Sequence, residues 1–190
     1  MSGAANMEKL LESMETSFKG VYLPPRFLKD FDSSLIYVPF TEDQHLPLPE
    51  EVKEEKLFSK NPNGLFLTPP GMDLSKLMEK KLETSFTRMN LEELLQRLPK
   101  PLVEDLEIAQ DVNTQIEGNS ITIEITDNAL KNLCTETRKL PKLHKTVGCP
   151  LSSALACALA KSTGKPVTIE NEEEIQEKKT TKILYHIKED

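Results

Sequence analysis

The chain has 190 residues, which is enough to bury a sizeable core and favours one domain over two. Its formal net charge of -7 and its pI of about 5.2 exclude nucleic acid as the main partner, because that binding needs clustered lysine and arginine. No apolar run approaches the roughly 20 residues of a membrane span, and charges interrupt the N-terminal apolar stretch, unlike in a secretory signal. We therefore expect a cytoplasmic protein whose three cysteines are reduced.

An amphipathic helix is predicted within residues 1–19. Asn6 is a good N-cap, and Gly20 lies just past the last apolar position. The apolar positions between them recur at helical spacing: Met7, Leu10, Leu11, Met14 and Phe18. Two alternatives stay open for this face: it packs on its own domain, or it mediates self-association or contact with a protein partner.

Residues 20–70 indicate short β-strands separated by proline. Three apolar segments, GVYLPP, SLIYVPF and GLFLTPP, each stop at one or two prolines. This pattern is typical of short strands that lie partly at sheet edges. The polar, proline-bearing stretch 41–56 between the second and third segments predicts a loop or a short surface helix.

Residues 71–108 are predicted to be helical. Asp73 is the expected N-cap of a first helix. Asn90 and Glu93 resemble a capping box at the start of a second helix, which ends at Pro99. Pro101 then opens a short third helix.

The clearest β pattern follows in the C-terminal part of the chain. Ile121, Ile123 and Ile125 alternate with polar residues after a turn at Gly118 and Asn119, as in a hairpin with one buried face. Further elements are predicted after this hairpin from caps and apolar runs. In chain order they are a short helix after Asp127, a loop at 139–146, a helix at 150–163, and strands at 166–170 and 180–187 joined by an acidic turn at 172–174.

Together these elements predict an α+β fold, with an antiparallel sheet built from hairpins and helices packed on one face. Residues 20–190 are expected to form a single domain after the N-terminal helix. Its first part, 20–108, holds short strands and helices, and its second part, 109–190, has the order hairpin, helix, hairpin.

The helix predicted at 150–163 is apolar on nearly every side. Pro150 suits its first turn, and Gly164 suits a left-handed C-terminal cap. Four small residues alternate with larger or thiol side chains inside it: Ala154, Ala156, Ala158 and Ala160. We expect such a helix to be buried on more than one face and to approach a neighbouring backbone closely.

This segment also carries a resemblance. GCPLSSALACALAKSTGKPV, followed by a strand, an acidic turn and a strand ending in YHI, resembles the C-terminal end of 4-vinyl reductase type domains over roughly residues 110–188. The resemblance implies a small-residue helix that packs on an antiparallel sheet and is followed by two strands. The paired cysteines of that family's final hairpin have no counterpart between Glu177 and Tyr185, so no metal or redox role carries over.

Over the whole chain, GVYLPP, GLFLTPPG and VGCPLSSALACALA in that order are similar to segments of a family of uncharacterised archaeal proteins. This second resemblance implies membership of such a family. It supplies no activity and no catalytic residue.

The start of the helix at 150–163 is the predicted binding site. Free backbone amides and the helix dipole attract an anion there. The residues expected to take part are Cys149, Ser152, Ser153, Lys145 and His144. A small anionic ligand at this point is one expectation, and an apolar ligand between the helix and the sheet is another. In the plainer alternative, the serine hydroxyls only cap their own helix.

Cys149 also raises the alternative of a thiol-dependent enzyme, because a helix N-terminus lowers a thiol pKa. No orienting carboxylate or oxyanion pocket is identifiable for it, and burial of Cys149 and Cys157 as small apolar residues is the favoured interpretation. Cys134 can approach Cys149 across the loop, but as a zinc site Cys134, His144 and Cys149 lack a fourth ligand. We therefore expect no metal and no cofactor.

These observations leave the function unknown. They favour a non-catalytic sensory, small-ligand-binding or protein-interaction module, with the Cys149 enzyme as the alternative.

Overall fold

Strands from the N-terminal and C-terminal parts of the chain pair in one antiparallel sheet. A computed structural model describes residues 2–14, 18–30, 32–42 and 45–189. In it, eight strands form one sheet in the order β3-β4-β2-β1-β7-β8-β6-β5, and each neighbouring pair is antiparallel. The strands are β1 (Val21–Leu23), β2 (Leu35–Pro39), β3 (Phe58–Lys60), β4 (Asn63–Leu67), β5 (Asp111–Glu117), β6 (Ser120–Thr126), β7 (Val167–Ile175) and β8 (Thr180–Ile187). The α-helices are α1 (Ser2–Ser13), α2 (Met72–Leu82), α3 (Leu91–Arg97), α4 (Lys131–Arg138), α5 (Pro141–Val147) and α6 (Pro150–Thr163).

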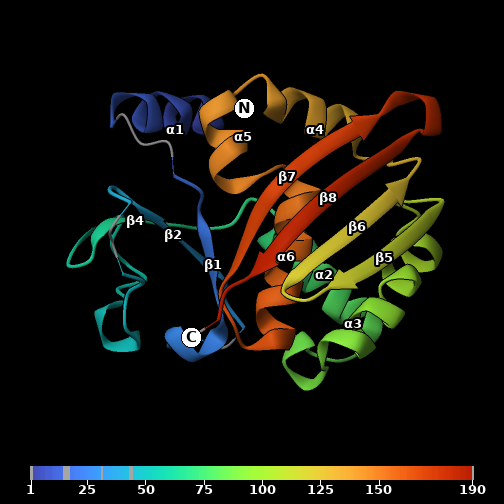
Figure 1. Ribbon diagram of the computed structural model, residues 1–190, viewed down its shortest axis with the longest axis horizontal. Helices are drawn as coiled ribbons and strands as arrows, with labels where there is room; N and C mark the ends of the chain where they lie inside the picture. The colour runs from blue at the N-terminus through green and yellow to red at the C-terminus, as the bar shows by residue number, and fades with distance from the viewer. Residues whose placement is uncertain (1, 15–17, 31, 43–44, 190) are drawn as a thin grey trace.

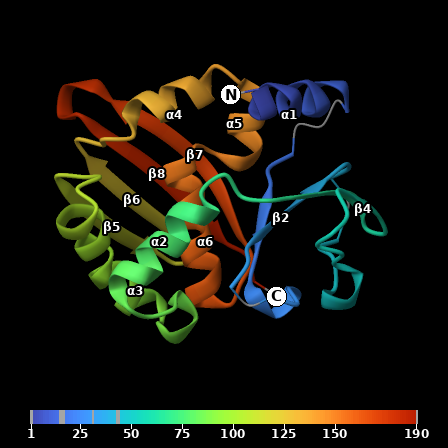
Figure 2. The same cartoon turned by 180° about the vertical axis from the view of Figure 1, so that it is seen from behind.

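Helices cover one face of the C-terminal half of the sheet. Seen from behind, α2, α3 and α6 lie over β5, β6, β7 and β8 (Figure 2), and α1, α5 and α4 follow one another along the end of the sheet at the top of both views (Figure 1). On β6, Ile121, Ile123 and Ile125 are fully buried, and the residues between them are half-buried. The predicted α+β class and the hairpin of β5 and β6 are confirmed.

The N-terminal half of the sheet is buried on both faces. Along β2, Ile36 and Val38 belong to the main core, whereas Leu35 and Tyr37 belong to a second cluster on the other face, closed by Val52. A continuous apolar run is the pattern of a strand covered on both sides. In the strand order, β1, β2 and β4 each have a neighbour on both sides, and β3 is the edge strand at this end of the sheet. The expected edge position of the proline-stopped strands is wrong, because their prolines only end them.

α1 differs from its prediction at both ends. It begins at Ser2, so Asn6 lies inside the helix, and it ends at Ser13. Alanines near its start are strong helix formers, which extends the helix ahead of the predicted cap. Residues 15–17, within the predicted helix, lie outside the described part of the chain.

One face of α1 packs on the rest of the chain. Leu11 is fully buried in the main core. The Glu8 carboxylate accepts hydrogen bonds from the backbone amides of Lys142 and Leu143, at 3.0 and 2.6 Å. α1 thereby caps the N-terminus of α5. Self-association through the remaining surface of α1 stays a prediction.

The segment 139–146, predicted as a loop, is mostly helical. α5 begins at Pro141 and ends at Val147, and its C-cap Gly148 has a φ of 73°. The prediction is wrong because the donor groups at the start of α5 are satisfied by Glu8, which lies more than 130 residues earlier in the chain. A local cap signal is therefore missing from the sequence.

The two middle helices agree better with their predictions. α2 begins at Met72, with Gly71 as its N-cap, two positions ahead of the expected cap at Asp73. At α3, the side chain of Asn90 accepts a hydrogen bond from the Glu93 amide at 2.9 Å, as predicted.

α6 forms the centre of the main core. Its predicted bounds are confirmed, and Gly164 ends it in the left-handed region at a φ of 64°. Every residue from Leu151 to Lys161 is buried. A side chain at Gly71 would collide with backbone atoms of Pro150 and Ala154, so α2 and α6 meet at backbone contact. Within the described parts of the chain, no helix is both long and apolar enough to cross a membrane.

β7 is longer than predicted. It continues to Ile175, so the expected acidic turn at 172–174 is wrong, and the reversal falls at the short helix η5 (Gln176–Lys178). A register shift between Ile169 and Asn171 marks a bulge in the pairing with β8. After a bulge the alternation of faces is offset. Because of this offset, the side chain of Glu172 points to the face of the sheet where α4 and α5 lie.

Candidate functional site

The start of α6 is fixed by bonds within the chain. Cys149 is the N-cap: its sulfur accepts from the Ser152 amide at 3.5 Å, and its amide donates to the Ser152 hydroxyl at 2.9 Å. Gly148 precedes it with a positive φ, and a side chain there would collide with Ser152. Two buried tyrosines, Tyr22 and Tyr185, donate to backbone carbonyls on either side of the cap at 2.6 and 2.9 Å. The Cys149 thiol is therefore held in one position.

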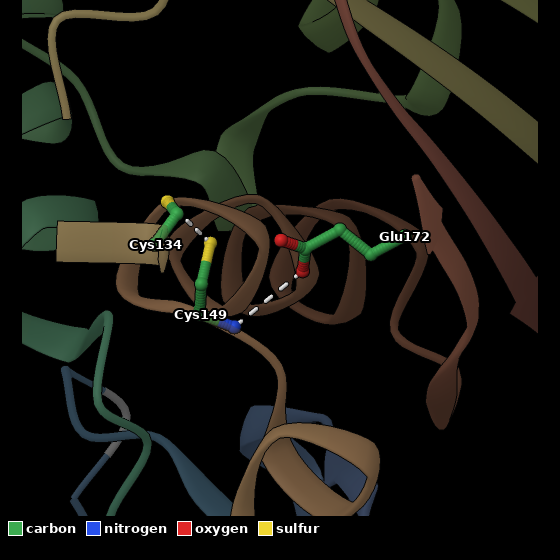
Figure 3. Close-up of side chains that lie close together, drawn as sticks. All are labelled: Cys134, Cys149 and Glu172. Carbon is green, nitrogen blue, oxygen red and sulfur yellow. Dashed lines mark hydrogen bonds between the residues drawn. The ribbon is translucent and has the colours of Figure 1, made fainter. Parts of the chain in front are cut away.

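Cys134 on α4 points at this thiol (Figure 3). The two sulfurs lie 2.8 Å apart in a thiol–thiol hydrogen bond, and both residues are at most 1% exposed. All three cysteines, each within the described chain, carry free thiols. The expected approach of Cys134 to Cys149 is confirmed.

Glu172 on β7 joins the two thiols from the opposite side (Figure 3). Its side chain is 2% exposed, and its carboxylate lies 3.5 Å from the Cys149 amide and 3.4 Å from Nε2 of His144. One carboxylate oxygen and the two sulfurs lie within 4.8 Å of one another. Arg138 binds Glu172 at 3.2 Å and Glu174 at 2.8 Å, which ties α4 to β7. We call Cys134, Cys149, Glu172 and His144 the thiol–carboxylate cluster.

The three acidic groups of the cluster have different proton affinities. Burial opposes the charge on Glu172, but contacts with His144 and Ser152 outweigh it and lower its pKa to about 2. The hydrogen bond with Cys149 lowers the pKa of Cys134. The same bond, together with burial and the charge of Glu172, raises the pKa of Cys149 well above its usual value. The expectation that the helix end lowers the pKa of Cys149 is therefore wrong.

Three of the five predicted site residues meet at the cluster: Cys149, Ser152 and His144. Ser153 is fully buried elsewhere on α6, where its hydroxyl accepts from the Gly71 amide at 3.0 Å. Lys145 is exposed on α5. The carboxylate of Glu172 lies where the sequence suggests an external anion, and binding of such an anion stays a prediction.

An open cavity of about 580 Å³ lies beside the start of α6. Gly148 and Pro150 form part of its wall. Most of the remaining wall is apolar: Ala4, Met7, Leu35, Leu57, Phe66, Leu67, Pro70, Leu133, Leu143 and Val147. The space beside the alanines of α6, where an apolar ligand was expected, is closely packed, with every residue from 154 to 160 at most 2% exposed.

A smaller, polar hollow of about 320 Å³ borders the thiol–carboxylate cluster. His144 and Glu172 form part of its wall. The other lining residues are Lys19, Lys145, Ile169, Glu170 and Asn171. The cluster is thus buried but adjoins an open hollow.

Together the fold and the site define an α+β protein in which a buried thiol–carboxylate cluster lies at the start of a central helix, beside an apolar cavity. The family model described as Domain of unknown function (DUF7982) matches residues 2–185, and the chain belongs to this family. The expectation of a family without an established function is confirmed. Comparison with the curated proteins and with the solved structures gives no match.

Sequence reasoning missed Glu172 as a site residue. The three consecutive glutamates at 172–174 indicated a solvated turn. In the structure they lie in the second half of strand β7. The one weak signal in the sequence was Ile175, an apolar residue directly after the glutamates. The bulge that turns Glu172 inward has no local signal of comparable strength.

Proposed function

We propose that this protein is a non-catalytic small-ligand-binding module of the cytoplasm, and that it holds a small, neutral, mostly apolar molecule in the cavity beside the start of α6. The cavity carries the proposal. Its volume of about 580 Å³ falls within the range of about 300 to 1,000 Å³ that is typical of ligand pockets.

The composition of the wall supports an apolar ligand. Its side chains come from α1, α4, α5, α6, β2, β4 and the segments beside them, and most are aliphatic or aromatic. Glu54, Glu55, Lys56, Thr68 and Thr137 supply its polar and charged side chains. A pocket with an apolar wall and few polar groups selects ligands by shape and by burial of apolar surface.

The position of α1 supports a sensory role for the same cavity. Ala4 and Met7 form one part of the wall, and Glu8 on the same helix holds the amides of α5. A ligand that packs against Ala4 and Met7 stabilises the docked helix, because it binds only the folded arrangement. Ligand binding is therefore coupled to the surface that α1 presents to a protein partner.

The state of Cys149 supports a module over a thiol enzyme. Cys149 is fully buried, and the pKa of its thiol is raised, so little thiolate forms at neutral pH. The order of the β5–β6 hairpin, α6 and the β7–β8 hairpin supports a likeness to 4-vinyl reductase type domains, which we retain as part of the proposal together with the archaeal affinity of the sequence.

Binding of a neutral apolar dye tests the proposal. Nile red should bind the wild-type protein with a stoichiometry of one, and Ala4→Phe and Thr137→Phe should weaken binding by about 10-fold or more because their rings fill the cavity. The matched control is Leu77→Phe, which adds a ring at a half-exposed position on α2 outside the cavity wall. Equal dye binding by the filled variants and the wild type, with far-UV circular dichroism unchanged, would contradict the proposal.

A further inference from the structure

Four potential metal ligands converge at the start of α6 from four separate elements. Cys134 comes from α4, His144 from α5, Cys149 from the cap of α6 and Glu172 from β7. The ligand atoms of Cys134, Cys149 and Glu172 lie within 4.8 Å of one another. Nε2 of His144 lies 3.4 Å from Glu172. The sequence offered only three of these ligands, and the fold supplies the fourth.

The chemistry of the set matches zinc. Zinc prefers four tetrahedral ligands drawn from cysteine, histidine and carboxylate groups. With metal–ligand bonds of about 2.0 to 2.3 Å, ligand atoms on one zinc ion lie about 3 to 4 Å apart. The two sulfurs, at 2.8 Å, therefore need to separate by about 1 Å, and the Glu172 carboxylate, within 4.8 Å of both, needs to close by a similar amount. The His144 ring has to turn towards the thiols, from a position 3.4 Å from Glu172.

His144 gives a second sign that the cluster lacks a group. Its Nε2 atom is buried and forms no hydrogen bond with any residue that the structure describes, and its contact with the Glu172 carboxylate, at 3.4 Å, is an ion pair without hydrogen-bond geometry. Buried polar nitrogen atoms nearly always have a partner, because leaving one without costs about 1 to 3 kcal/mol. A metal ion bound to the lone pair of Nε2 would supply that partner.

Charge and access also fit a cation. Two thiolates and the Glu172 carboxylate carry three negative charges, which a divalent ion and the Arg138 guanidinium balance. Arg138 orients the carboxylate as an outer partner of a metal ligand does. The polar hollow lined by His144 and Glu172 provides a route from solvent.

We propose that Cys134, His144, Cys149 and Glu172 form a structural zinc site that locks α4, α5 and β7 to the start of α6. The site has four protein ligands and no open position, so the ion stabilises the fold and does no chemistry. This proposal is independent of ligand binding in the apolar cavity, since none of the four residues lines that cavity.

Titration of the reduced, metal-free full chain with cobalt(II) and zinc tests the site. We expect one cobalt ion per chain, visible bands of a tetrahedral centre, thiolate-to-cobalt charge-transfer bands, and loss of all bands when zinc is added. Zinc at about 100 times its dissociation constant should raise the Tm by about 5 to 10 °C.

Variants separate this site from chance binding. Cys134→Ala, Cys149→Ala and His144→Gln should each weaken binding by about 100-fold or more. Cys157→Ala is the matched control, because Cys157 is a buried thiol on α6 outside the cluster, and it should bind like the wild type. If a ligand variant fails to fold, the cobalt spectrum of the wild-type chain still decides.

Two outcomes would overturn the proposal. One is the absence of thiolate-to-cobalt bands in the reduced wild-type chain. The other is a Cys134–Cys149 disulfide in the protein as purified, combined with no uptake of zinc after its reduction.

Discussion

The two ends of α6 differ in their surroundings. From Ala154 onward the helix is surrounded by tightly packed backbone and apolar side chains. In its last turn Lys161 is 4% exposed and paired with Glu79 at 2.9 Å. At its start, Cys149 meets a second thiol and a carboxylate, with an open cavity and a polar hollow nearby. The closely packed end leaves no room for a ligand.

This contrast assigns stability to one end and binding to the other. Close packing makes a region sensitive to small changes of volume. The start of α6 borders open space, so added volume is tolerated there and functional groups can reach a ligand. The predictions below compare substitutions at the two ends.

The largest effect is expected at the buried ion pair of the packed end. Lys161→Met leaves the Glu79 carboxylate without its cation, and removing one partner of a buried pair costs about 3 to 5 kcal/mol. Urea denaturation measures the loss. The control is Lys76→Met, on the exposed side of α2, which should change the free energy of unfolding by less than about 0.5 kcal/mol. Equal effects of the two substitutions would show that the pair is dispensable.

Gly71→Ala should follow, with a loss of about 3 kcal/mol. The added methyl group meets backbone atoms of Pro150 and Ala154, which cannot move aside as a side chain can. Gly3→Ala is the matched control, because nothing lies within 4 Å of the new methyl group, and it should leave stability unchanged or slightly raised. A stable Gly71→Ala protein would contradict the backbone contact between α2 and α6.

Alanine-to-leucine substitutions in the packed part of α6 and beside the cavity at its start give the most direct comparison. Ala158→Leu overpacks the core and should destabilise the protein by about 1 to 3 kcal/mol. Ala4→Leu adds the same atoms beside the cavity and should change stability by less than about 0.5 kcal/mol while weakening dye binding. Thermal denaturation with and without Nile red measures both effects. The comparison fails if the two variants are destabilised alike.

The packed helix could be predicted from the sequence, whereas the cluster could be predicted only in part: Cys134, Cys149 and His144 were candidates, and Glu172 was not. Pro150, the alternating alanines and Gly164 are local signals of where α6 starts, what surrounds it and where it ends. The strands of the β5–β6 hairpin are equally local. The cluster depends on long-range contacts: Glu8 makes α5 a helix, and the bulge in β7 turns Glu172 inward. The cavity depends in the same way on where α1 docks.

The smallest effect is expected from titration of Cys157, the thiol of the packed end. Burial raises its pKa to about 12, against about 9 when the chain is unfolded. Because the folded state holds the proton more tightly, the stability from this group is complete below pH 9 and is lost as the pH rises from 9 towards 12. At pH 10 the loss should be about 1 kcal/mol relative to pH 8.

Cys157→Ala isolates this contribution from the other groups that titrate in alkali. The variant should lose about 1 kcal/mol less than the wild type between pH 8 and pH 10, whatever its stability at pH 8. Urea denaturation at the two pH values gives the difference. Because the packed end excludes water from the thiol, parallel pH profiles of the variant and the wild type would show that solvent reaches Cys157, and the contrast between the two ends of α6 would not hold at this residue.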